Sequence, residues 1–127
     1  MNLPETQSQF RRCTCCSRVW LDRSDFLLDG DLFLNGYQAN FDDLELGWLL
    51  FTHLQPVCNS TLAVPLHQFA DLYEGPIYSE RKTGSEECPG YCLEVNNLLP
   101  CKNHCECAFV REILQIIKER KYYLLAD

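Results

Sequence analysis

Five of the nine cysteines in this 127-residue chain lie within twenty positions near its C-terminal end. Cys88 and Cys92 form one pair, Cys101 and Cys105 form a second pair with the same spacing, and Cys107 follows. Tetrahedral zinc takes four thiolate or imidazole ligands, usually supplied as two pairs with two to four residues inside each pair. We therefore predict a metal site made from four of these five cysteines.

The chain around these pairs suits this chemistry. Pro89-Gly90 can turn the backbone so that the sulfurs of Cys88 and Cys92 face one point. The second pair precedes a predicted helix, whose unpaired N–H groups and positive dipole end stabilise thiolates. Cys88, Cys92, Cys101 and Cys105 are the leading set, with Cys107 or His104 as a replacement.

A second cysteine set lies near the N-terminus. Cys13 and Cys16 have the C-x-x-C spacing of a zinc knuckle, and Cys15 competes with them inside it. The obvious third ligand is Cys58. The fourth ligand stays open between His53, His67, Cys15 and Cys107. A second metal site and a set of unrelated thiols are therefore equally weighted interpretations of these cysteines.

Zinc is the predicted cofactor, and an iron–sulfur cluster on the same cysteines is the alternative. Cys88-Pro89 matches the end of a ferredoxin-type run, but the preceding C-x₂-C-x₂-C-x₃ part is absent. A thiol-based redox protein is the third reading. Thioredoxin-like chemistry places C-x-x-C between a strand and a helix, whereas Cys13 follows a polar segment.

Composition limits the class of protein. Hydrophobic residues make up 46% and charged residues 23%, as in an average globular chain. Eighteen acidic and eleven basic residues give a net charge of −7, which argues against nucleic-acid binding. No apolar run is long enough for a secretory signal or a membrane span. We expect a cytoplasmic protein without membrane contact, whose thiols stay reduced.

The expected fold class is α+β: a small antiparallel sheet with a C-terminal amphipathic helix and cysteine-rich metal-binding segments at both ends. One domain covers residues 1–127. Residues 1–18 hold the N-terminal knuckle, 19–76 the sheet core with a short helix, and 77–127 the cysteine-rich segment with the last helix.

Alternating apolar residues predict the strands. Residues 48–53 and 60–64 should pair as antiparallel neighbours across a loop over 54–59. Asp29-Gly30 or Asn35-Gly36 could close a hairpin. A short helix should run from Pro65 to Tyr73.

The last helix is expected to begin near His104, with Asn103 as N-cap and Glu106 completing a capping box. Its apolar stripe includes Phe109, Ile113, Ile116 and Ile117 and should face the core. Arg111, Lys118 and Glu119 should fill the polar face. The apolar residues 122–125 make a protein partner or a homodimer contact through this helix a further expectation.

No catalytic motif is found: a phosphate-binding loop, a nucleophile elbow and H-E-x-x-H are all missing from the sequence. We assign no catalytic and no cofactor-binding residues, and an enzyme is the minority interpretation. The expected function is a metal-stabilised binding or regulatory module. Cys92→Ser and Cys105→Ser should destabilise it strongly, and Cys58→Ser only a little.

Overall fold

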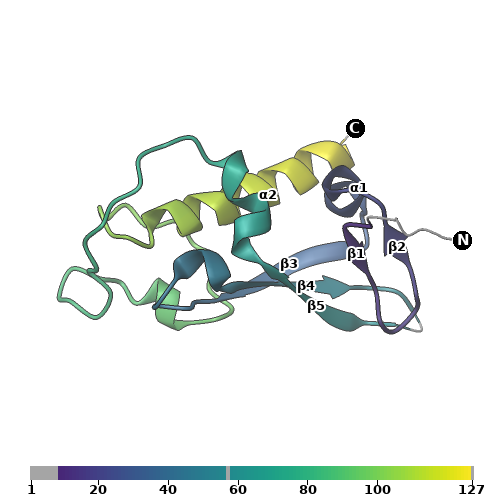
Figure 1. The fold of residues 1–127 in the computed structure, drawn as a ribbon, viewed down its shortest axis with the longest axis horizontal. Helices are drawn as coiled ribbons and strands as arrows, with labels where there is room; N and C mark the ends of the chain where they lie inside the picture. Colours follow the sequence, from purple (N-terminus) through teal and green to yellow (C-terminus); the bar gives the residue numbers. More distant parts are fainter. Residues whose placement is uncertain (1–8, 57, 127) are drawn as a thin grey trace, which may run out of the picture.

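Two antiparallel sheets and a layer of helices form an α+β fold (Figure 1). The computed structural model describes residues 9–56 and 58–126, with side chains as far as residue 119. The small sheet pairs β1 (Arg11–Arg12) with β2 (Val19–Trp20). The larger sheet has the order β3-β4-β5, from β3 (Leu32–Gln38), β4 (Trp48–His53) and β5 (Ser60–Pro65).

The helices are α1 (Arg23–Leu28) and α2 (Ala108–Ala126), with 3₁₀ turns η1 (Leu44–Leu46), η2 (Leu66–Leu72) and η3 (Tyr91–Leu93). The expected helix after Pro65 is therefore a 3₁₀ helix. None of the described helices has the length and apolar character needed to cross a membrane.

Strand β4 forms where alternation predicted it, and β5 extends one residue further than expected. Leu49, Phe51 and His53 point into the core, whereas Trp48 on the other face is 43% exposed. The pairs Leu49↔Val64 and Phe51↔Leu62 bury one face of the sheet. The period of two thus positions His53 on the buried face.

The two turn dipeptides do not close a hairpin. Asp29-Gly30 links α1 to β3, and Asn35-Gly36 lies inside β3 at a bulge opposite Phe51 and Leu50. Gly36 is needed there because a Cβ atom would lie 2.8 Å from the carbonyl oxygen of Val95. Next to it, the Tyr37 N–H donates to that same oxygen at 2.9 Å. This contact joins the cysteine-rich segment to the sheet.

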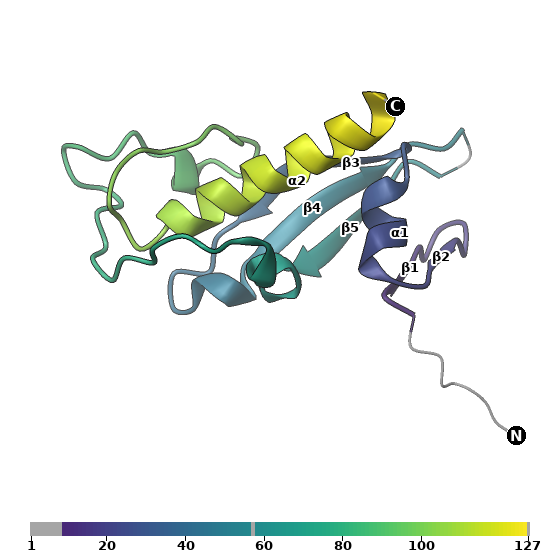
Figure 2. The same cartoon turned by 90° about the horizontal axis from the view of Figure 1, so that it is seen from above.

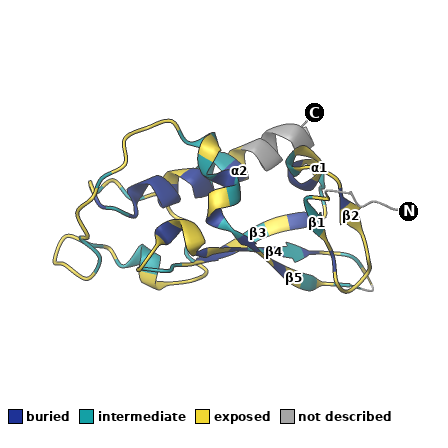
Figure 3. Ribbon diagram, viewed as in Figure 1, coloured by how far each residue is buried: buried dark blue, intermediate teal, exposed yellow. Residues whose placement is uncertain are grey.

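Helix α2 crosses the sheet on one side, with α1 beside its C-terminal part (Figure 2). Its apolar residues Phe109, Val110, Ile113, Leu114 and Ile117 are buried in the shared core (Figure 3). The prediction that this stripe belongs to the core is confirmed for these residues, but Ile116, expected in the same stripe, is only half-buried. Residues 122–125 belong to the helix, but their side chains lie outside the described part.

Three expectations for α2 were wrong. The helix begins at Ala108, four residues after His104, because the preceding turn directs Cys105 and Cys107 inward. Asn103 donates to the carbonyl of Glu87 instead of capping the helix, and Glu106 pairs with Arg81. Arg111, expected on the polar face, is only 1% exposed.

The β1–β2 hairpin is held against the sheet by aromatic side chains. Trp20 is fully buried, and its ring lies 5.2 Å from those of Phe26 and His53 in edge-to-face contacts. Phe10 packs on Phe26 and Phe69 in the same way. This packing brings the turn with Cys13 and Cys16 to the end of β4. The long segment with the five C-terminal cysteines lies at the opposite end of the molecule (Figure 1).

Candidate metal centre

Four donor atoms converge at the end of the sheet that carries the β1–β2 hairpin. The sulfurs of Cys13, Cys16 and Cys58 and a ring nitrogen of His53 all lie within 4.8 Å of one another. Cys13 and Cys16 come from the turn between β1 and β2, His53 ends β4, and Cys58 lies in the β4–β5 loop. The structure therefore brings together three segments that could hold one metal ion.

The donor spacing fits a single tetrahedral ion. With bonds of about 2.3 Å to sulfur and 2.0 Å to nitrogen, tetrahedral ligands lie about 3.8 Å apart for two sulfurs and about 3.5 Å for sulfur and nitrogen. The sulfurs of Cys13 and Cys58 are 3.4 Å apart. The Nδ1 atom of His53 lies 3.7 Å from the sulfurs of both Cys16 and Cys58. All nine cysteines are free thiols.

The backbone after Cys16 and after Cys58 follows the same local pattern. The residue after Cys16, Ser17, has a φ of 67°, and the residue after Cys58, Asn59, has a φ of 51°. These left-handed conformations turn the next backbone group, of Arg18 or Ser60, toward the preceding sulfur. Such bonds favour the thiolate over the thiol, and the thiolate is the form that binds metal.

The pKa values of Cys13 and Cys58 are lowered. The Arg18 backbone also lowers the pKa of Cys16, but burial and hydrogen bonds with Cys13 and Cys58 outweigh it and raise that pKa. Burial opposes the ionisation of Cys13, but hydrogen bonds from the Ser60 hydroxyl, from the backbone of Cys16 and Cys15 and from His53 lower its pKa to about 5. The Ser60 hydroxyl lies 3.2 Å from the Cys13 sulfur and 3.1 Å from the Cys58 sulfur. It also lowers the pKa of Cys58. The single proton of this hydroxyl can be donated to either of the two sulfurs.

His53 is oriented by a carboxylate behind it. While Nδ1 faces the sulfurs, Nε2 faces the Oδ2 atom of Asp29 at 3.9 Å. That carboxylate is itself fixed, because Trp20 Nε1 donates to Oδ2 at 2.9 Å and the Asp31 N–H donates to Oδ1 at 2.8 Å. Metal-binding histidines usually direct their second nitrogen at such a group, which sets the tautomer and the ring orientation.

We expect Asp29→Asn to weaken metal binding at this centre by about 10- to 100-fold, the usual cost of losing such an orienting carboxylate. An amide holds no negative charge against the ring, and the imidazole is then a poorer donor. The measurement is zinc affinity in competition with a chromophoric chelator. Asp25→Asn, which removes an exposed carboxylate from α1, is the matched control. Equal affinities for the two variants would contradict this role.

Of the residues considered for the fourth position, the structure favours His53. Cys15 is exposed and directs its sulfur to the carbonyl of Cys58 at 3.8 Å, and His67 is exposed on η2. Cys107 belongs to the other end of the molecule. The sequence could not choose between them because their positions relative to the knuckle depend on tertiary structure.

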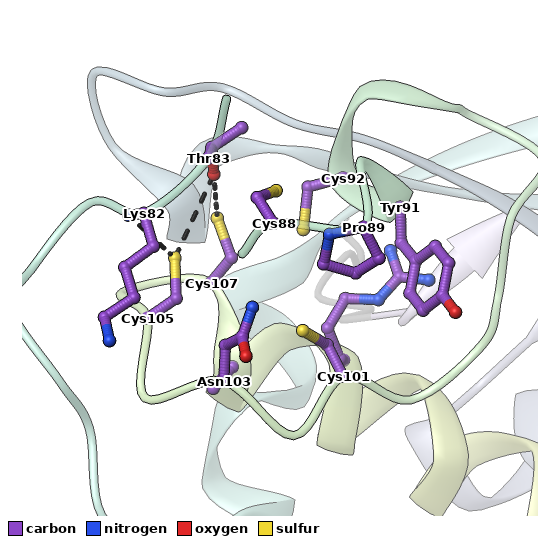
Figure 4. Close-up of a pocket in the computed structure, with 12 residues that line it drawn as sticks. Lys82, Thr83, Cys88, Pro89, Tyr91, Cys92, Cys101, Asn103, Cys105 and Cys107 are labelled. Atoms are coloured by element: carbon purple, nitrogen blue, oxygen red, sulfur yellow. Dashed lines mark hydrogen bonds between the residues drawn. The ribbon is translucent and has the colours of Figure 1, made fainter. Parts of the chain in front are cut away.

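The five C-terminal cysteines line one small cavity of about 20 Å³ (Figure 4). Cys105 and Cys107 are buried, and Cys88, Cys92 and Cys101 are half-buried. His104 stacks on Tyr78 at 4.5 Å and does not line the cavity. Among the described residues, the hairpin-end group is the only set of three or more donors close enough to hold one metal ion, so these sulfurs form no such set. Their role as metal ligands therefore stays a prediction.

Cys92 and Cys107 interact directly within this set. A hydrogen bond from Cys107 and the nearby guanidinium of Arg111 lower the pKa of Cys92. The same bond, together with burial, raises the pKa of Cys107.

The centre at the hairpin end has the donor set of a Cys₃His metal-binding group. The chain itself matches no known protein family, no curated protein and no solved structure.

Proposed function

We propose that the protein is a small zinc-binding module in which one zinc ion, held by Cys13, Cys16, His53 and Cys58, fastens the β1–β2 hairpin to the main sheet. The observation that supports it is the approach of four donors from three chain segments to within 4.8 Å. These segments are distant in sequence, so packing of the sheet and the hairpin has to create the group.

Zinc is favoured over an iron–sulfur cluster by the spacing. The sulfur–sulfur and sulfur–nitrogen distances of 3.4 and 3.7 Å correspond to the edges of one tetrahedron around one ion. Ligands bound to different irons of a cluster lie farther apart. Three thiolates and one imidazole are also a common zinc set.

A structural role agrees with the ligand count. Catalytic zinc keeps one position open for water, whereas four protein ligands close the coordination sphere. We propose a binding or regulatory module in a reducing compartment such as the cytoplasm, since all nine cysteines are free. Contact with a protein partner or a second copy through α2 is part of this proposal. The basis for this contact is the apolar sequence at 122–125, whose side chains lie outside the described part.

Anaerobic purification followed by metal analysis tests this function. We expect colourless protein containing zinc, and Cys58→Ser should contain one zinc less per chain than the wild type. Cys15→Ser, which removes the neighbouring thiol outside the group, should keep the wild-type zinc content. Iron with sulfide, or a zinc content unchanged by Cys58→Ser, would overturn the proposal.

A further inference from the structure

We propose a second zinc site, made by Cys88, Cys92, Cys105 and Cys107 at the far end of the sheet, with Cys101 outside the coordination sphere. This inference goes beyond the function proposed above, because neither site supplies a ligand to the other.

The cavity between these cysteines has the size of a single ion. Its volume of about 20 Å³ compares with the roughly 10–15 Å³ needed to admit one water molecule. Five thiols line it, together with Lys82, Thr83 and Arg111. A change of χ1 rotamer can move a thiol from the wall of such a space toward its centre. Such rotations would bring four of the five sulfurs around one cation.

Backbone amides approach these sulfurs as they do in the first centre. The Gly90 N–H donates to the sulfur of Cys88 at 3.3 Å, and Gly90 has a φ of 82°. The Lys82 N–H donates to the sulfur of Cys105 at 3.3 Å. The Thr83 hydroxyl lies 3.6 Å from the Cys107 sulfur and 3.9 Å from the Cys105 sulfur. These donors are placed to stabilise negative sulfur.

A buried positive charge lies beside the same cavity. The side chain of Arg111 is 1% exposed, and its guanidinium donates to the carbonyl oxygens of Asn97 and Leu99. Among the described side chains no carboxylate forms an ion pair with it. Buried charges need a partner of opposite sign. Four thiolates on Zn²⁺ carry a net charge of −2 (four times −1, plus 2), and the guanidinium beside Cys92 offsets part of it.

Contacts and position distinguish Cys101 from the other four. Among the described residues, none forms a hydrogen bond with the Cys101 sulfur. Each of the other four sulfurs has a contact, made by a backbone amide, the Thr83 hydroxyl, Arg111 or another thiol. Cys101 also lines an outer, open hollow together with Glu87 and Lys102. It therefore lies at the rim of the cavity.

Zinc counting by native mass spectrometry on the full chain tests the site. We expect two zinc ions in the wild type, one in each of Cys88→Ser, Cys92→Ser, Cys105→Ser and Cys107→Ser, and two in Cys101→Ser. A wild type with one zinc that disappears in Cys58→Ser would overturn this second site and leave the proposed function standing. Loss of one zinc in Cys101→Ser, with retention in Cys107→Ser, would overturn the ligand assignment.

Alkylation of the wild type gives a readout that does not depend on folded variants. With zinc bound, iodoacetamide should label Cys101, and labelling of the other four should rise at least tenfold once a chelator is added. Equal labelling of all five before chelation would overturn the site.

Discussion

Replacing Cys58 by serine is expected to lower the free energy of unfolding by on the order of 5 kcal/mol, because structural zinc contributes about 10–16 kcal/mol of binding energy to small domains. A serine hydroxyl is a poor zinc ligand, so the hairpin loses its attachment to the β4–β5 loop. The sequence alone predicts little effect for this isolated cysteine. Its sulfur lies 3.4 Å from that of Cys13, which reverses the expectation.

Tryptophan fluorescence during urea denaturation measures this effect. Trp20 is fully buried against His53, whereas Trp48 is exposed, so a shift to longer wavelength reports mainly on Trp20. A chelator should produce the same shift in the wild type. Cys15→Ser, two residues from Cys13 and outside the donor group, should behave like the wild type. A Cys58→Ser protein with wild-type stability and emission would exclude a structural metal here.

Arg111→Met should cost about 1–3 kcal/mol of stability, because backbone carbonyl oxygens lose hydrogen bonds from a charged donor. Methionine fills much of the same space but donates no hydrogen bonds. The carbonyl oxygens of Asn97 and Leu99, at 2.6 to 2.9 Å from the guanidinium, would then lose these donors. The segment before Cys101 would lose its main attachment to α2.

Urea denaturation followed by circular dichroism checks this value. Lys118→Met makes a comparable change on the exposed face of the same helix and should alter stability by less than about 0.5 kcal/mol. If the two variants were equally stable, the guanidinium would carry no such structural role.

The elements that are predicted correctly are those whose apolar periodicity lies within their own segment of sequence. In β4 the apolar residues alternate, and in α2 they recur at helical spacing. In both elements this periodicity predicts which face is buried. The start of α2 was missed because the directions of Cys105 and Cys107 depend on Thr83 and Lys82, far away in sequence. Arg111 was placed on the wrong face for the same reason: its partners lie in the loop at 97–99.

The candidate sites divide in a similar way. Spacing predicts Cys13 and Cys16, and Cys58 is the obvious third ligand, but His53 is one of four choices because nothing in its sequence context distinguishes it. Its selection depends on β4 ending beside the hairpin turn. At the other end, sequence favoured Cys101 for its regular spacing, whereas cavity position and hydrogen bonds favour Cys107.

Because β1 and β2 are short, we expect the hairpin to unfold locally before the rest of the molecule. Strands of two residues each form too few ladder bonds to persist alone. The three-stranded meander and the helices supply most of the apolar core, to which the hairpin adds Cys13 and Trp20. Amide protons of the hairpin should therefore exchange with solvent through a local opening, well before those of β4. If the proposed zinc were removed, this local opening at the hairpin end should become more frequent, while β4 keeps its protection.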